Sequence, residues 1–292
     1  MTAMTTPLAN PVARPDPHAA SLPQARDVAA FRAVFTGPLA SLPQPVCGEP
    51  DDGGLYLTFR QLGDPTVQAM IQERFAPAYP DGDRRAVASM WSKWLFNALL
   101  PTVTGLLLTE GRGCTADDSS VGVVLSEAGY PQRFWIRETG DVTAPVAIPV
   151  GLAALARQRL SPVIDALSTV SGASRNVFWS NAGNTLEYVI GEMARHPAIT
   201  PLMLEQGYAF LECRRLDDGQ RNPLFRPVRY RAPAGETGSV ERQRRVCCIR
   251  YLLPNLSYCS NCPLNCRRGN VAATDEGDVC RNTARRAGEG TV

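Results

Sequence analysis

Four cysteines close to the C-terminal end constrain this 292-residue chain more than any other feature. Cys247 and Cys248 are adjacent, ten residues follow, and Cys259 and Cys262 complete a CC-x10-CxxC pattern. Four thiolates are soft, negatively charged ligands that suit a [2Fe–2S] cluster, and a tetrahedral zinc ion would accept the same set. Zinc ribbons usually offer two CxxC pairs, whereas the first pair here consists of neighbours. The spacing therefore favours iron.

The adjacent pair of cysteines also requires a particular backbone conformation. Side chains of consecutive residues in an extended strand point to opposite faces, so both thiols can serve one centre only if the chain turns sharply there. We predict that one [2Fe–2S] cluster is held by four ligands: Cys247, Cys248, Cys259 and Cys262.

Two further cysteines leave an alternative open. With Cys266, the CxxC pair extends to CxxCxxxC, and Cys280 follows in a segment with almost no large apolar residues. A cubane [4Fe–4S] cluster or an exchanged ligand is therefore conceivable. We treat both residues as non-ligands, and the isolated Cys47, Cys114 and Cys213 as small hydrophobic residues.

The sequence around the motif is similar to that of the FhuF-type ferric-siderophore reductases, whose C-terminal signature is this cysteine run around a [2Fe–2S] centre. The similarity covers residues 244–251 and 258–264. Residues 91–101 and 178–184 are more weakly similar to the helical body of the family. The resemblance implies a one-electron oxidoreductase that takes a ferric siderophore as substrate and releases Fe(II) in iron acquisition. It also implies an external electron-donor protein, such as a ferredoxin or a reductase.

The chemistry of iron chelates is consistent with this resemblance. Hard oxygen donors such as hydroxamates hold Fe(III) strongly and Fe(II) weakly, so one electron makes the ion labile. Each tenfold preference of a chelator for Fe(III) lowers the potential of the complex by about 59 mV, and the donor must be correspondingly reducing. Cluster ligation by thiolates alone gives lower potentials than ligation that includes histidine. The chain contains only His18 and His196.

Composition restricts where such a protein works. With 44% apolar and 20% charged residues, the chain resembles an ordinary soluble globular protein, and no signal peptide is recognisable. The longest apolar run, Trp94–Leu108, contains Asn97, Pro101 and Gly105 and is shorter than the ~20 residues that span a bilayer. We predict a cytoplasmic protein with no integral membrane segment, in which nine cysteines favour metal ligation over disulfides.

Positive charge is concentrated near the cysteines. Between Arg214 and Arg286 there are 15 arginines and seven acidic residues, while Lys93 is the single lysine of the chain. Such a surface attracts anionic partners: an acidic electron donor, an anionic ferric chelate or nucleic acid. An iron–sulfur regulator that binds DNA is thus one alternative, and a structural zinc module on a helical binding protein is another. Without a helix-turn-helix we predict no nucleic-acid partner.

Roles in substrate binding are harder to assign. For Arg244, Arg245 and Arg250 we favour a role in offsetting thiolate charge over one in holding a chelate. Asn181 and Asn184 either line a polar pocket or belong to an ordinary exposed helix face. The sequence has no P-loop and no dinucleotide-binding GxGxxG motif, so electrons must arrive from another molecule. No catalytic acid or base is nominated.

The expected fold class is α+β, with a predominantly helical body, a small antiparallel β component and a C-terminal cysteine-ligated iron–sulfur segment. Alternation and turn signals predict strands at Leu55–Leu62, Val121–Ser126, Arg133–Arg137, Arg226–Arg231 and Val246–Leu253.

Helical spacing begins at Asp83 and is interrupted or restarted at Pro101. A second helical region begins near Gly151, Ser161 caps a new helix with Pro162 at its first position, and Ser174 caps a helix that reaches Arg195. Trp91, Trp94 and Trp179 are expected in the core of this helical layer.

Four parts are expected along the chain. These are a flexible leader at 1–25, a helix-rich body at 26–210, a basic segment with the cluster motif at 211–268, and a disordered tail at 269–292.

Overall fold

A computed structural model describes residues 33–40, 44–48, 54–112, 121–136, 145–231 and 240–265 of the chain. The predicted leader, the predicted tail, Cys114, Cys266 and Cys280 lie outside the described residues, so the expectations placed on them stay predictions.

A long central helix, α4 (Arg84–Glu110), organises the molecule. The carboxylate of Asp83 accepts a hydrogen bond from the Arg85 N–H at its start, and Gly111 ends it in the left-handed conformation, with φ of 64°. The predicted interruption at Pro101 is wrong, because the helix runs through this residue. Pro101 is buried within a helix that is covered on nearly all sides, so tertiary packing outweighs the lost N–H donor.

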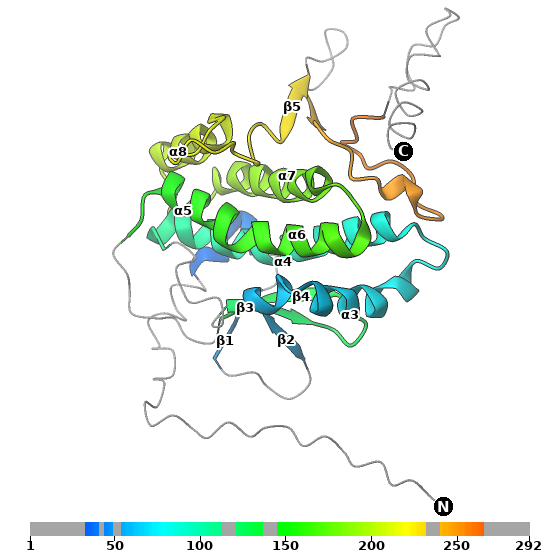
Figure 1. Ribbon diagram of the computed structural model, residues 1–292. Coiled ribbons are helices and arrows are strands. Elements are labelled where there is room, and N and C mark those ends of the chain that lie inside the picture. Colours follow the sequence, from blue (N-terminus) through cyan, green and yellow to red (C-terminus); the bar gives the residue numbers. More distant parts are fainter. Residues whose placement is uncertain are drawn as a thin grey trace, which may run out of the picture.

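A four-stranded sheet packs against one side of α4, and α7 (Arg175–Met193) packs against the other (Figure 1). The strand order is β1-β4-β3-β2, antiparallel except where β1 joins β4. The strands are β1 (Val46–Cys47), β2 (Leu55–Thr58), β3 (Val121–Leu125) and β4 (Pro131–Ile136).

The first predicted strand is shorter than expected. Thr58 ends it and caps a helical turn, α2 (Phe59–Leu62), through a capping box with Gln61. The predictions for the next two strands are confirmed in β3 and β4, whose side chains are mostly buried.

The remaining helical elements surround α4 and α7. They are η1 (Gly37–Leu39), α3 (Pro65–Phe75), η2 (Ala76–Ala78), α5 (Ile148–Ala154), η3 (Leu155–Leu160), α6 (Ser161–Ser171), α8 (Pro201–Glu212) and η4 (Arg250–Leu252).

The two predicted helix starts have different outcomes. Ser174 caps α7 by accepting a hydrogen bond from the Asn176 N–H, as predicted. Ser161 caps nothing, because its own backbone is helical, with φ of −60° and ψ of −50°. The π-helical turn η3 joins α5 to α6 and accommodates Pro162 without a break.

After α8 the chain becomes mostly irregular. β5 (Val228–Arg231) pairs with β6 (Glu241–Arg244) in an antiparallel ribbon beside α7, which confirms the strand predicted at 226–231 (Figure 1). The strand predicted at 246–253 is wrong, because Ile249 has a φ of 50° and the chain continues into η4.

The core lies between the sheet, α4 and the outer helices. Trp91 and Trp179 are buried there as predicted, whereas Trp94 is 44% exposed and packs edge-on against Tyr130. No helix among the described residues is long and apolar enough to cross a bilayer. The α+β fold class, with its helical body and small sheets, is confirmed.

Candidate iron–sulfur site

The four motif cysteines come together beside the N-terminal half of α4. Cys247 and Cys248 follow β6, and Ile249 then turns the chain with left-handed backbone angles, φ 50° and ψ 13°. This is the sharp turn that the adjacent pair requires. The CxxC loop closes through a hydrogen bond from the Cys262 N–H to the Cys259 carbonyl, 3.1 Å long.

The sulfur atoms lie in two close pairs, with no disulfide between them. Sγ of Cys247 lies 3.7 Å from Sγ of Cys262, and Sγ of Cys248 lies 3.7 Å from Sγ of Cys259. A tetrahedral metal ion with bonds of about 2.3 Å to sulfur separates two ligands by roughly 3.8 Å. Each pair therefore has the spacing of two thiolates on one metal ion, and each takes one cysteine from either half of the motif.

The donor set therefore fits a two-iron centre. A [2Fe–2S] cluster takes four thiolates, two on each iron, and two pairs are what the chain presents. Within the ranges that the structure describes, no group of three or more His, Cys, Asp or Glu side chains is placed so that it could hold one metal ion.

Burial differs among the four thiols. Cys248, Cys259 and Cys262 are at most 8% exposed, whereas Cys247 is only half-buried. Backbone N–H groups reach two of the sulfurs: Ile249 donates to Cys247 at 3.3 Å, and Leu264 donates to Cys262 at 3.4 Å. Hydrogen bonds of this kind tune the potential of a cluster.

Two positive side chains lie near the sulfurs. Hydrogen bonds with the Cys247 and Cys259 thiols lower the pKa of Cys248, and the charges of Lys93 and Arg244 act in the same direction. The lowered pKa favours the thiolate, which is the form that binds metals, at Cys248 alone, because hydrogen bonding to Cys248 raises the pKa of Cys247 and of Cys259.

Arg244 is buried, and Lys93 is half-buried. Burial lowers the pKa of Lys93 and of Arg244, while the sulfur charges of Cys248 and Cys259 raise both. The predicted role of Arg244 in offsetting thiolate charge agrees with this geometry. Lys93 was missed as a site residue, although its being the one lysine in an arginine-rich chain was a usable signal.

A buried polar cluster joins the cysteine turn to the helical body. The side-chain amide of Asn181 on α7 donates to the hydroxyl oxygens of Ser89 and Ser92 on α4, and its oxygen accepts from Arg244 at 2.6 Å. The Ser89 hydroxyl in turn donates to the Cys248 carbonyl at 2.7 Å. Asn181 is fully buried, so it is neither a pocket residue nor part of an exposed face.

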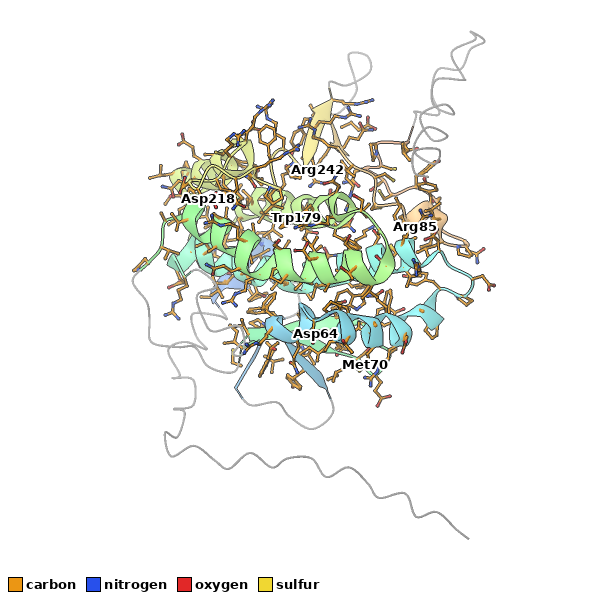
Figure 2. All side chains as sticks on the ribbon, viewed as in Figure 1. Asp64, Met70, Arg85, Trp179, Asp218 and Arg242 are labelled. Atoms are coloured by element: carbon orange, nitrogen blue, oxygen red, sulfur yellow. The ribbon has the colours of Figure 1, made fainter. Side chains whose placement is uncertain are left out.

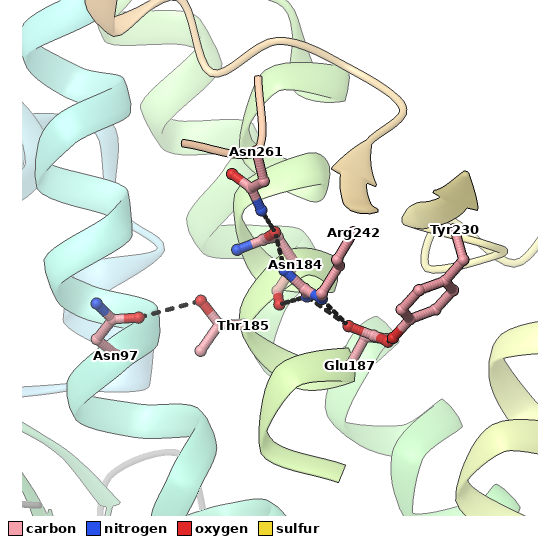
Figure 3. A network of polar contacts seen from close by, with 7 residues as sticks. All are labelled: Asn97, Asn184, Thr185, Glu187, Tyr230, Arg242 and Asn261. Atoms are coloured by element: carbon pink, nitrogen blue, oxygen red, sulfur yellow. Dashed lines mark hydrogen bonds and ion pairs between the residues drawn. The ribbon is translucent and has the colours of Figure 1, made fainter. Parts of the chain in front are cut away.

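A second network holds the CxxC loop and the β5–β6 ribbon (Figure 3). The Asn261 amide donates to Asn184 Oδ1 at 2.7 Å, and Arg242 donates to the same oxygen at 3.0 Å. Arg242 also forms an ion pair with the buried Glu187, whose other oxygen accepts from Tyr230. Asn184 therefore braces the loop and the ribbon against α7.

A helical body with two pairs of thiols is the arrangement expected of an iron–sulfur protein, and comparison with known proteins makes it an oxidoreductase. The model of the FhuF 2Fe–2S C-terminal domain matches residues 244–264, which include all four cysteines. The model described as ferric iron reductase FhuF-like transporter matches residues 89–238.

The chain belongs to this family, with a [2Fe–2S] cluster as its cofactor, and the predicted resemblance is confirmed. One relative, the ferric siderophore reductase of Escherichia coli (strain K12), is 27% identical over 183 residues. The match covers 62% of this chain and 67% of that protein.

Proposed function

We propose that this chain reduces ferric siderophores, one electron at a time, and that Cys247, Cys248, Cys259 and Cys262 hold its cluster. The observation that carries the proposal is the pair of 3.7 Å sulfur separations inside the matched cluster domain. The name of the Escherichia coli relative, ferric siderophore reductase, supports the choice of substrate.

The pairing suggests how the thiols share the irons. Cys247 and Cys262 would bind one iron, and Cys248 and Cys259 the other. The cluster, when bound, supplies single electrons at low potential. The buried Cys248 and Cys262 exclude water on the side of the body, and the half-buried Cys247 gives the substrate its approach.

The proposed reaction balances with one external electron. Chelated Fe(III) gains it and becomes Fe(II), which hard oxygen ligands hold weakly, so that the metal is released. A donor protein, such as a ferredoxin or a reductase, then returns an electron to the chain. We place this reaction in the cytoplasm, where thiols stay reduced.

The test uses protein reduced with dithionite and freed of excess reductant without oxygen. Ferric siderophores of several classes are added, with a ferrous-specific dye present. The expected result is reoxidation of the cluster, measured through its visible absorption. One Fe(II) should be trapped for each electron that the cluster loses. The proposal fails if purified protein contains one zinc and no sulfide, or if no ferric chelate reoxidises the cluster.

A further inference from the structure

A basic pocket of about 700 Å³ lies on the surface beside the cysteine turn. Its walls come from α7, from the loop region between α8 and β5, and from the residues just after β6. Pockets of 300–1,000 Å³ are typical for small-molecule ligands. Five arginines line it: Arg214, Arg215, Arg221, Arg226 and Arg245.

The charge of this pocket is largely uncompensated. None of its lining residues is acidic. Arg226 is paired with Glu212, while the other four arginines have no ion pair within the part of the chain that the structure describes. A cleft lined by one sign of charge concentrates the opposite charge, and guanidinium groups bind carboxylate and similar oxygen anions with paired N–H bonds.

Aromatic side chains complete the wall. Arg214 and Arg226 lie over the ring of Phe225, with the guanidinium carbons 5.2 and 5.3 Å from the ring centroid. Such stacking limits the freedom of both arginines before any ligand arrives. Trp179 of α7, labelled in Figure 2, also lines this pocket.

The pocket adjoins the proposed cluster. Val246, which precedes Cys247 in the chain, lines it. Ser180 lines it too, and its hydroxyl donates to the Val246 carbonyl at 2.8 Å, which fixes this wall to α7. Cys247 is the least buried of the four thiols. A molecule in the pocket would therefore lie next to the most accessible edge of the cluster.

We propose that this pocket binds the ferric chelate, and that it selects chelates of net negative charge whose metal is wrapped by carboxylate or catecholate oxygens. The inference rests on the proposed function and adds to it the substrate class and the binding residues. Arg245, for which the sequence favoured charge compensation over chelate binding, becomes a substrate-binding residue, whereas Arg244 remains buried beside the sulfurs.

Gallium(III) chelates test binding without electron transfer, because they match ferric chelates in charge and shape and are not reduced by the protein. The full-length, cluster-loaded protein is titrated with anionic Ga(III) tricatecholate, anionic Ga(III) citrate and a neutral Ga(III) trihydroxamate. Calorimetry and tryptophan fluorescence report binding. We expect at least one anionic chelate to bind tenfold or more tightly than the neutral one, with an affinity that falls as salt rises.

The double variant Arg221→Gln/Arg245→Gln locates the site. Its affinity for the anionic chelate should fall at least tenfold, while its iron content and circular dichroism stay unchanged. Arg133→Gln is the matched control, because Arg133 is an exposed arginine of β4, across α4 from α7. It should bind like the unaltered protein.

Each other outcome is informative. Equal binding of neutral and anionic chelates, or full binding by the double variant, overturns the inference. If the double variant binds chelates normally but is no longer reduced by an acidic donor protein, the pocket is a donor site instead, and the inference is overturned. If anionic gallium chelates bind but no ferric chelate is reduced, the binding site stands and the proposed function fails.

Discussion

The helical body and the cysteine segment (residues 244–265) are stabilised in different ways. The body is held by large apolar side chains with no exposure, among them Trp91, Phe96 and Phe178. The segment buries three of its cysteines and Leu253, has a single 3-10 turn, and is attached through Asn181 and Asn184. The stability of the body is distributed over many apolar contacts, whereas that of the segment depends on a few hydrogen bonds and the cluster. Damage to the segment should therefore leave the body folded.

The largest effect is expected from Cys259→Ser. A serine hydroxyl is a poor ligand for iron in this setting, so the cluster should be lost and ferric reduction should fall below detection. The segment should become protease-sensitive while the helical circular dichroism persists, because cluster binding and local folding are coupled.

Cys213→Ser is the control for this change, since Cys213 is exposed and lies outside the motif. It should retain two irons and two sulfides per chain. A Cys259→Ser protein that unfolds completely would contradict the proposed independence of the two regions.

An intermediate effect is expected from Gly183→Ala on α7. A Cβ at this position would lie 2.5 Å from Cβ of Pro227, so the chain that leads into β5 must shift. Overpacking of this kind costs about 1–3 kcal/mol. Thermal unfolding should show the loss, and iron content should fall because the segment docks less well.

Gly191→Ala on the same helix is the matched comparison. Its nearest neighbour would be the Tyr208 hydroxyl, at 3.3 Å, which is the end of a mobile side chain. Replacement of a helical glycine by alanine favours the helix by roughly 1 kcal/mol. If both variants behaved alike, close contact between α7 and Pro227 would not be what positions the segment.

The smallest effect is expected from Lys93→Met. Lys93 belongs to α4 of the body and interacts electrostatically with the cysteine segment. The ammonium group stabilises negative charge on the sulfurs of Cys248 and Cys259, and reduction adds one negative charge to the cluster. Its removal should lower the midpoint potential by on the order of 50 mV, near the value of about 59 mV that changes a one-electron equilibrium tenfold.

A redox titration followed by electron paramagnetic resonance measures this shift. Lys93→Arg keeps the charge and should leave the potential almost unchanged. Equal potentials for the Lys93→Met variant and the unaltered protein would show that Lys93 is electrostatically remote from the cluster.

Elements with local signals were predictable. Ser174 marks the start of α7 because a cap needs only its own hydroxyl and the next N–H groups. β3 and β4 follow from short apolar runs on either side of a turn signal. The failures at Pro101, Ser161 and Val246–Leu253 have a common cause. At each place packing from distant parts of the chain overrode a local preference: a buried helix, a π-helical turn and a turn that gathers thiols.

By itself, the sequence indicated which residues are proposed to hold the cluster, because four cysteines within 16 residues can meet through local turns alone. The tertiary structure decided which residues surround that chemistry. Ser89 and Cys248 are 159 positions apart, yet they share a hydrogen bond, and Asn181 reaches Arg244 across 63 positions. Contacts at such separations depend on how α4 and α7 pack, which no local pattern records. The arginine pocket arises in the same way, from segments brought together only when the chain folds.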